Sequence, residues 1–178
     1  VGGISGCSGS GSQIDAAVAS TLTMTSGAAH HVNIDTDPTD VAMGGAVSMV
    51  VRLYDVNNNL VTNSAGVTLT LSLDKAGTFS GGVTTSGIPF TAGVASFGVG
   101  GGDLALSISS VNTNYTLTAT PTGSVAADSS ATFNVKGVDH YVISDNVAGS
   151  RELNAGSAFI ATITAKDADE RTVLGFSG

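Results

Sequence analysis

Two short acidic segments contain the first residues whose types and spacing could do chemistry. Asp55, Asn57 and Asn59 alternate along one segment, and Asp167 and Asp169 alternate along another. Alternating carboxylate and amide oxygens open the calcium loops of proteins, so these five residues are candidate calcium ligands. A full EF-hand loop also needs Gly at its sixth position and Glu at its twelfth, and neither segment supplies both. Asx turns that close β-hairpins account for the same residues without a metal.

A second polar group lies where the first alternating segment begins. His30 and His31 are adjacent, and Asp35 and Asp37 follow them. On an extended strand, a His and an Asp four positions later share a face and could bind a metal together. Because zinc sites usually need three or four converging ligands, we interpret these residues as a polar strand edge.

The sequence offers no recognisable catalytic pattern. Ser is abundant, but no Gly-x-Ser-x-Gly elbow occurs between a strand pattern and a helix pattern. Residues 98–102 are glycine-rich, yet a phosphate-binding loop must precede a helix, and strand patterns lie on both sides here. We therefore expect a protein that is not an enzyme and that needs no cofactor.

Cys7 is the single cysteine, so it cannot form a disulfide within the chain. Ile4-Ser5-Gly6-Cys7 matches the short motif before a lipidated cysteine in bacterial lipoproteins, and Gly and Ser follow it like a tether. A lipoprotein signal also needs a charged start and an apolar core upstream. We therefore interpret the segment as a Gly/Ser-rich loop or linker and keep Cys7 as a candidate for lipidation.

Composition narrows the classes of partner. The chain has 178 residues, of which 14 are acidic and 6 basic, for a formal charge of −8. The basic residues are scattered, whereas nucleic acids and anionic lipids require clustered Lys and Arg. No apolar run approaches the ~20 residues of a membrane span. Low charge with abundant Ser, Thr and Gly is typical of secreted proteins, so we expect an extracellular or cell-surface location.

The elements that must position these residues are β-strands. Apolar residues alternate with Thr or Ser, as in Val67 to Leu73 and in Phe159 to Ala165. A period of two with one polar face is typical of antiparallel strands that are covered on one side. Turns rich in Asn, Asp and Gly separate the strands, which favours an all-β sandwich. The expected strands are 31–36, 47–55, 60–63, 66–74, 88–91, 94–99, 104–109, 114–120, 130–136, 140–144, 158–166 and 172–174.

The same alternation predicts the core. Residues that share one face of each strand should lie between two sheets about 10 Å apart. The expected core residues are Met49, Val51, Leu53, Val67, Leu69, Leu71, Phe97, Leu117 and Phe133.

The two acidic segments belong to a longer internal repeat. When the sequence is shifted by 112 positions, Gly44 to Gly66 lies without a gap on Gly156 to Gly178, and Asp55 falls on Asp167. A period of this length corresponds to one domain rather than to a short solenoid unit. The sequence therefore contains parts of consecutive similar domains.

The repeat divides the chain into three segments. Residues 30–137 should form a complete sandwich, and residues 138–178 hold only the opening strands of a second one. Residues 1–29 combine a Gly/Ser-rich stretch with a terminal or donated strand, for which Leu22 and Met24 are the candidate core-facing residues. Because so few strands cannot bury a sandwich core, either the chain continues or another subunit completes the second domain.

The order of motifs resembles a known family. Thr36-Asp37-Pro38 precedes Met43-Gly44-Gly45, and then come Asp-x-Asn-x-Asn, Val-Thr-Leu-Thr-Leu, Gly-Thr-Phe-Ser-Gly-Gly and Tyr-Thr-Leu-Thr-Ala. This order resembles the bacterial immunoglobulin-like tandem repeats of invasin- and intimin-type surface proteins and other large secreted proteins. The resemblance implies an immunoglobulin-like Greek-key β-sandwich, an extracellular stalk or fibre role and no catalytic residues. Asn58 and Glu170 stand where that family usually has Gly in the turn.

These observations lead to one functional expectation and one alternative. We expect a structural, non-catalytic segment of an extracellular filament, stalk or adhesin, whose partners are neighbouring immunoglobulin-like domains or identical subunits. Strand complementation between subunits would be a route to such a polymer. The alternative is a carbohydrate- or protein-binding module, including a virion decoration protein. Exposed aromatic anchors usually mark such modules, but most Tyr and Phe residues here fit core or strand positions.

Overall fold

The strand-forming sequence produces an all-β structure. The computed structural model describes residues 25–80, 84–98, 100, 103–145, 156 and 160–175. These residues form strands and no helix, so they include no helix long and apolar enough to cross a membrane. The strands are β1 (His31–Thr36), β2 (Val41–Ala42), β3 (Met49–Tyr54), β4 (Thr68–Leu73), β5 (Ile88–Pro89), β6 (Val94–Phe97), β7 (Asn112–Tyr115), β8 (Leu117–Pro121), β9 (Asp128–Ser129), β10 (Phe133–Lys136), β11 (His140–Asp145) and β12 (Ala161–Lys166).

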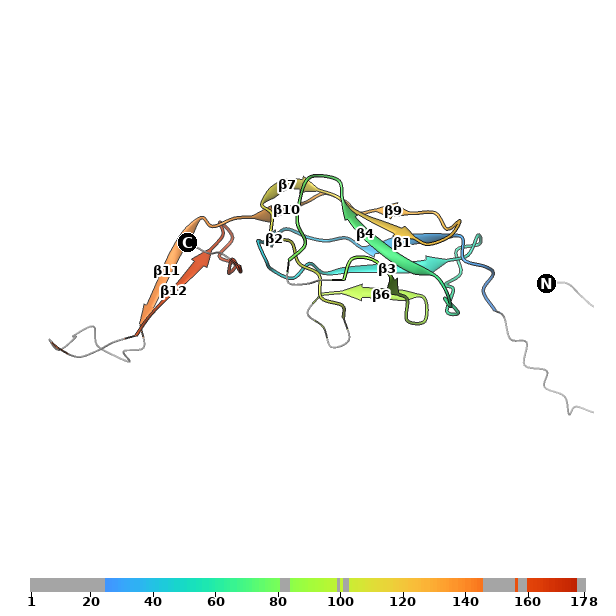
Figure 1. Ribbon diagram of the computed structural model, residues 1–178, viewed down its shortest axis with the longest axis horizontal. Helices are drawn as coiled ribbons and strands as arrows, with labels where there is room; N and C mark the ends of the chain where they lie inside the picture. The colour runs from blue at the N-terminus through green and yellow to red at the C-terminus, as the bar shows by residue number, and fades with distance from the viewer. Residues whose placement is uncertain are drawn as a thin grey trace, which may run out of the picture.

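Most of the strands surround one core (Figure 1). One sheet has the strand order β1-β3-β6, and a second has the order β5-β4-β8-β9. A short third sheet has the order β2-β10-β7, in which β2 runs parallel to β10. The β11-β12 pair projects from one end of these sheets. Several sheets around a common core are consistent with a β-sandwich, so we call residues 30–137 the sandwich.

Alternation along the strands fills the core of the sandwich. In β3, Met49, Val51 and Leu53 are buried and the residues between them are partly exposed. Leu69 of β4 and Leu117 of β8 are buried in the same core. Eight of the nine core residues expected from the sequence are buried, and the ninth, Val67, is partly buried against them. The period-two pattern therefore identified the inner faces correctly.

Strand boundaries differ from the expectation where the chain changes partners. The expected strand 114–120 is divided at Thr116, because Tyr115 pairs with Phe133 while Leu117 pairs with Leu73 in a different sheet. The expected strands 60–63, 104–109 and 172–174 contain only isolated bridges. Alternation marks the face on which a side chain lies, but it does not determine how many residues find a partner in the ladder.

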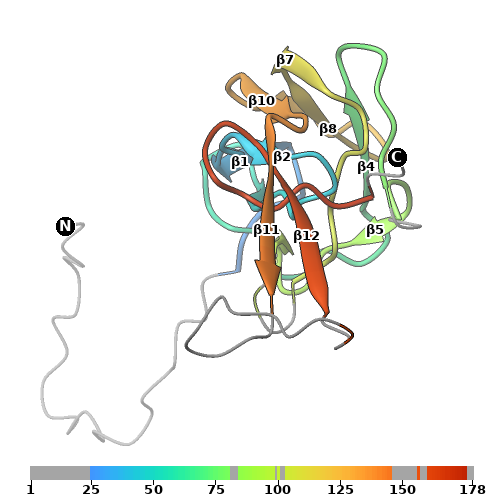
Figure 2. The same ribbon diagram turned by 90° about the vertical axis from the view of Figure 1, so that its left-hand side faces the viewer.

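The projecting strands repeat the pairing of the first strands of the sandwich. His31 lies opposite Tyr54 in the β1-β3 pair, and His140 lies opposite Lys166 in the β11-β12 pair. Tyr54 and Lys166 are separated by the same 112 positions as the sequence repeat. We call β11, β12 and the turn after them, residues 167–175, the C-terminal hairpin, whose two strands lie side by side in Figure 2.

Candidate functional site

The turn after β3 is built around a buried aspartate. Asp55 is only 1% exposed, and its Oδ1 accepts hydrogen bonds from the backbone N–H groups of Asn57 and Asn59, both at 2.9 Å. Its Oδ2 accepts the backbone N–H of Gly27 at 2.8 Å and the Asn59 side-chain amide at 3.1 Å. These donors, the Asn59 backbone N–H above all, lower the pKa of Asp55 from 3.8 to about 2. The carboxylate therefore organises the turn as an anion.

The turn after β12 repeats this arrangement. Asp167 is fully buried, and its Oδ1 accepts the backbone N–H groups of Asp169 and Arg171, both at 2.9 Å. The Arg171 Nε donates to Asp167 Oδ2 at 2.9 Å, where the first turn uses an Asn side chain. Burial alone would raise the pKa of Asp167, but the Arg171 backbone N–H and guanidinium outweigh it, so this pKa lies below its ordinary value.

The five candidate calcium ligands therefore lie in two turns whose central carboxylates already accept several N–H groups. A calcium ion takes six to eight oxygen ligands. Among the described residues, no group of three or more His, Cys, Asp or Glu is arranged to hold a metal ion. Calcium binding at these turns stays a prediction, and Asx turns describe the geometry that is seen.

The second turn also attaches the C-terminal hairpin to the sandwich. The Leu174 backbone N–H donates to the Met43 carbonyl at 2.9 Å. Gly44 permits this approach, because a Cβ at that position would lie only 2.6 Å from the Leu174 carbonyl oxygen. Gly44 also has a φ of +74°, which Gly adopts more readily than other residues. The sandwich end and the turn therefore meet backbone to backbone.

A network of charges surrounds this contact. The Arg171 guanidinium donates to the Asp40 backbone carbonyl in the sandwich and to the Asp169 carboxylate in its own turn. The Lys136 Nζ lies 2.6 Å from Asp169 Oδ2 and 3.4 Å from Asp40 Oδ2. Asp169 raises the pKa of Lys136 above its ordinary value. We call Asp40, Lys136, Asp169 and Arg171 the junction network.

The junction network is fixed on its sandwich side as well. Asp40 Oδ1 accepts the backbone N–H of Asn134 at 2.8 Å, and both Asp40 oxygens lie 3.0 Å from the Asn134 side-chain amide. These bonds to Asn134 are the main cause of the lowered pKa of Asp40. The carboxylate that faces Lys136 is therefore held in place by the strand that carries Lys136.

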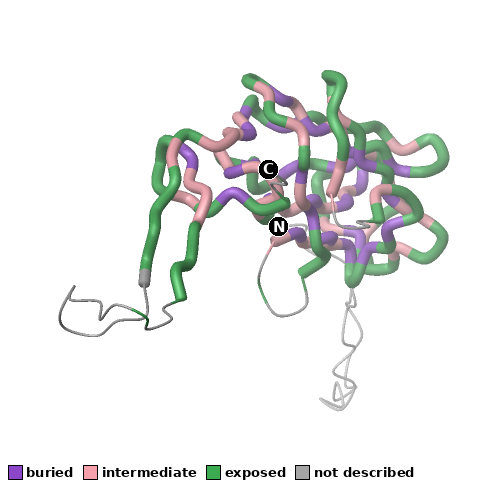
Figure 3. The backbone as a smooth tube through the Cα atoms, turned by 60° about the vertical axis from the view of Figure 1, so that its left-hand side comes forward, coloured by how far each residue is buried: buried purple, intermediate pink, exposed green. Residues whose placement is uncertain are grey.

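The connection between the two parts is short. β10 ends at Lys136 and β11 begins at His140, so only residues 137–139 lie between them. Figure 3 shows burial in the hairpin at the end nearest the sandwich, where Asp167 and Val173 are buried. A short connection, a backbone hydrogen bond and the junction network together join the hairpin to the sandwich. This junction is our candidate functional site.

The histidine and aspartate residues near the start of β1 do not converge on one point. The His31 ring stacks on Tyr54 with ring centroids 5.7 Å apart. Asp35 accepts hydrogen bonds from Arg52 and from the Tyr54 hydroxyl, the latter at 2.9 Å. Asp37 accepts a backbone N–H from the segment after β9. These contacts agree with a polar strand edge.

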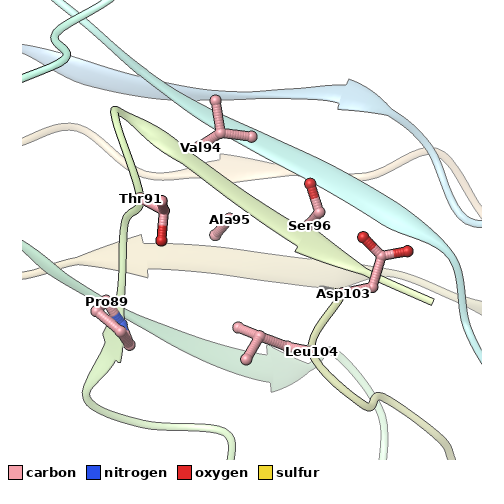
Figure 4. Close-up of a pocket in the computed structure, with 7 residues that line it drawn as sticks. All are labelled: Pro89, Thr91, Val94, Ala95, Ser96, Asp103 and Leu104. Carbon is pink, nitrogen blue, oxygen red and sulfur yellow. The ribbon is translucent and has the colours of Figure 1, made fainter. Parts of the chain in front are cut away.

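A pocket of about 380 Å³ lies alongside β6 (Figure 4). Asp103 is the one carboxylate among its lining residues, and Asp103 Oδ2 accepts the Gly100 backbone N–H at 3.0 Å. Among the described residues, the lining offers no His, Cys or second acid that could act with it in acid–base chemistry. The residues that line the pocket are Pro89, Thr91, Val94, Ala95, Ser96, Asp103 and Leu104.

Other residues singled out in the sequence lie outside the described part of the chain. Cys7, the candidate for lipidation, is one of them, as are Leu22 and Met24, the candidates for strand donation. Both ideas stay predictions.

Sequence reasoning selected only Asp169 of the junction network, as a candidate calcium ligand, and missed Asp40, Lys136 and Arg171. The internal repeat contained a usable signal, because Arg171 falls on Asn59 when the sequence is shifted by 112 positions. The residue at this position bonds to the buried aspartate in both turns. The guanidinium of Arg171 has more N–H donors than the aspartate accepts, and the remaining donors indicate an acceptor outside the turn.

Comparisons with known proteins add little to these observations. No family model matches the chain, and no curated protein matches it. Among solved structures, domains 4–9 of the surface layer protein SbsC are similar at 20% sequence identity and a TM-score of 0.43. The match covers 82% of this chain but 21% of that one, so this chain spans about a fifth of the length of that structure. A likeness at this level does not assign a fold or a function.

Proposed function

We propose that this chain is a structural, non-catalytic segment of an extracellular or cell-surface stalk, filament or adhesin, built from consecutive immunoglobulin-like sandwiches. The observation that supports the proposal most is the junction, where the turn around Asp167 attaches the hairpin to the end of the sandwich. Its task would be to hold successive domains at a nearly fixed angle, so that a row of them stands away from a surface.

The parts of the junction differ in strength. The side chains of Lys136, Asp169 and Arg171 are about one-third to one-half exposed, and exposed ion pairs contribute only about 0–1 kcal/mol each. The backbone hydrogen bond between Leu174 and Met43 and the short covalent connection should contribute more, because neither depends on exposed ion pairs that salt weakens. The junction network should therefore narrow the range of angles rather than hold the parts together alone.

The experiment measures the distribution of distances across the junction. Spin labels on exposed sites of the sandwich and of β12 would be compared by pulsed electron paramagnetic resonance. We expect one narrow distribution in the unmodified chain. The double variant Lys136→Ala with Arg171→Ala should broaden it, because both cationic side chains of the junction network are lost.

Arg52→Ala is the matched control. Arg52 forms an exposed ion pair with Asp35 on β1 and does not belong to the junction network. This variant should leave the distribution unchanged. A broad distribution in the unmodified chain would show a loose connection and would rule out the role as a stiff spacer.

A binding module is the second candidate, and one surface favours it. The outer face of the β1-β3 pair carries the stacked rings of His31 and Tyr54 beside Asp35 and Arg52. Aromatic rings next to hydrogen-bonding groups are a common way to bind sugars or protein side chains. Binding on a glycan array that is lost in Tyr54→Ala would support this candidate, and an array without signal would count against it.

Strand complementation between subunits is a further part of the proposal. It would make assembly depend on Leu22 and Met24. If it operates, Leu22→Asp should reduce the fraction of oligomer measured by analytical ultracentrifugation. A chain that stays monomeric at high concentration would remove this part of the proposal and leave the spacer role intact.

A further inference from the structure

The C-terminal hairpin carries an exposed apolar face. Ile143 of β11 lies directly opposite Ile163 of β12, so both side chains lie on the same side of the pair. Ile143 is 69% exposed and Ile163 is 64% exposed. Tyr141 lies opposite Ala165 two positions further along the strands, on the same side as Ile143 and Ile163. We call these four residues the Ile143–Ile163 face.

The corresponding face of the sandwich is buried. Because His140 and His31 occupy the same place in their strand pairs, Ile143 corresponds to Ile34 and Ile163 corresponds to Val51. Ile34 lies opposite Val51, as Ile143 lies opposite Ile163. Yet Ile34 is only 8% exposed and Val51 is fully buried.

The cover over the sandwich face is an aliphatic sheet. Leu69 and Leu71 of β4 pair with Pro121 and Ala119 of β8, and all these side chains except that of the proline belong to the buried hydrophobic core. β1 also makes contacts with β8. The β4-β8 pair therefore supplies the second layer over Ile34 and Val51.

The opposite face of the hairpin is mostly polar. Ser144 lies opposite Thr162, and His140 lies opposite Lys166, with Val142 and Thr164 between these pairs. A strand pair that is apolar on one side and polar on the other is suited to one covering layer, with water on its other side. The hairpin thus has the pattern of one layer of a sandwich.

The size and charge of the face restrict what can cover it. Its four residues carry no charge, so they offer an ionic ligand no charged partner. Stable complexes between separate proteins bury ~800 Å² on each partner, so a separate protein would have to cover more of the hairpin than these four side chains. A layer joined covalently to the hairpin avoids this requirement, because its effective concentration is high.

We propose that the Ile143–Ile163 face is the inner face of a second sandwich and binds an aliphatic β-sheet of the β4-β8 type, carried on the same polypeptide. This inference rests on the proposed function, in which similar domains follow one another, and it identifies the layer that covers the hairpin in the second domain. It specifies a covering sheet with Leu-like residues on alternate positions. In the sandwich, Leu69 and Leu71 of β4 occupy such positions in the core that they share with Val51 of β3.

The test extends the full chain with its own sequence. Because Gly66 falls on Gly178 in the repeat, residues 67–137 can be joined directly after Gly178 without a break in register. The dye anilinonaphthalene sulfonate, which binds exposed apolar surface, should bind the chain of residues 1–178 and lose most of its fluorescence with the extended chain. Amide hydrogen exchange in β11 and β12 should become at least about tenfold slower on extension, because the covering layer must open first.

Matched variants separate the two faces. In the extended chain, Ile143→Thr combined with Ile163→Thr should restore fast exchange and dye binding. Val142→Thr changes a residue of similar shape on the opposite face and should leave both signals unchanged. Equal effects of these variants would contradict a role for one particular face.

Three outcomes would overturn the proposal. The first is a face already protected in the monomeric chain of residues 1–178. The second is protection through a dimer of that chain, abolished by Ile143→Asp, which would make a second copy the partner. The third is a face that stays exposed both in the extended chain and in a second extended chain that has a Gly/Ser linker before residue 67. The distance measurement at the junction uses the unextended chain, so failure of the spacer role is detected separately.

Discussion

Asp55 and Asp167 occupy the same place in two turns that are 112 positions apart. In each turn, Oδ1 of the aspartate accepts the backbone N–H groups of the residues two and four positions later, all at 2.9 Å. The two turns differ in what surrounds them. Asp55 Oδ2 accepts the N–H of Gly27, whereas Arg171 at Asp167 Oδ2 extends to the carbonyl of Asp40 in the sandwich. The same arrangement of hydrogen bonds thus forms a turn around Asp55 and, around Asp167, a turn that also connects the hairpin to the sandwich.

Acid should destabilise the sandwich through Asp55. Its pKa is 3.8 ordinarily and about 2 in the folded protein, so the unfolded state binds more protons as the pH falls between these values. The stability that the ionised carboxylate contributes is therefore complete above about pH 5 and is lost progressively as the pH falls towards 2. Asp55→Asn should lower the stability at pH 7 and flatten its dependence on pH in this range. Urea unfolding at several pH values measures both effects, and an unchanged slope would contradict the role of Asp55.

Gly44→Ala should loosen the junction more than a comparable change elsewhere. The new Cβ would lie 2.6 Å from the Leu174 carbonyl oxygen, in addition to the strain of a φ of +74°. Gly66→Ala is the matched control, because Gly66 has a φ of +83° and open space around it. Both variants should lose about 1–2 kcal/mol from backbone strain. Only Gly44→Ala should broaden the distance distribution across the junction, and equal broadening in both would contradict the packing argument.

Glu170→Gly should stabilise the turn of the C-terminal hairpin. Glu170 has a φ of +65° and Asn58, in the same place of the first turn, has a φ of +61°. Gly adopts this conformation without the cost of about 1–2 kcal/mol borne by other residues, while Asn tolerates it better than Glu. Hydrogen exchange in β12 should therefore slow in Glu170→Gly. The gain from Asn58→Gly, measured by urea unfolding, should be smaller.

Glu170→Ala separates this effect from the contact between Glu170 Oε1 and His140 Nε2 at 3.3 Å. The variant removes the contact but keeps a Cβ in the strained conformation, so it should not stabilise the turn. Faster exchange in Glu170→Gly than in the unmodified chain would show that the contact with His140 outweighs the strain.

Tyr115→Phe should destabilise the sandwich by about 0.5–1.5 kcal/mol, the usual contribution of a hydrogen bond. The Tyr115 side chain is fully buried, and its hydroxyl lies 3.2 Å from the Ala76 carbonyl and 3.3 Å from the Ser110 carbonyl. Thermal unfolding measures the change. Tyr54→Phe is the control, because its hydroxyl bonds to Asp35 near the surface and its loss should stay within about 0.5 kcal/mol. Equal losses in the two variants would contradict the importance of burial.

The local structure of the turns was predictable from the sequence. Asp, Asn and Gly after an alternating segment predicted hairpin turns, and the shift of 112 positions predicted that Asp55 and Asp167 play equal parts. Hydrogen bonds from residues two and four positions later depend only on neighbouring residues, so the sequence pattern contains them. The inner faces of the strands followed from alternation for the same reason.

The place where the chain changes sheets was not predictable. Tyr115 and Leu117 belong to one alternating run, but they pair with Phe133 and Leu73 in different sheets. Asn114, with a φ of +55°, lies just before this change. The choice of partner depends on where distant strands lie, and alternation carries no information about that.

By itself, the sequence determined the strand-rich composition, the buried faces and the two equal turns, because these depend on neighbours along the chain. The tertiary structure alone decided that Arg171 meets Asp40, 131 positions away, and that Gly44 makes room for Leu174. It also decided that Ile143 and Ile163 are exposed while Ile34 and Val51 are buried. The sequence makes these pairs equivalent, and only the presence of a covering sheet in space makes them different.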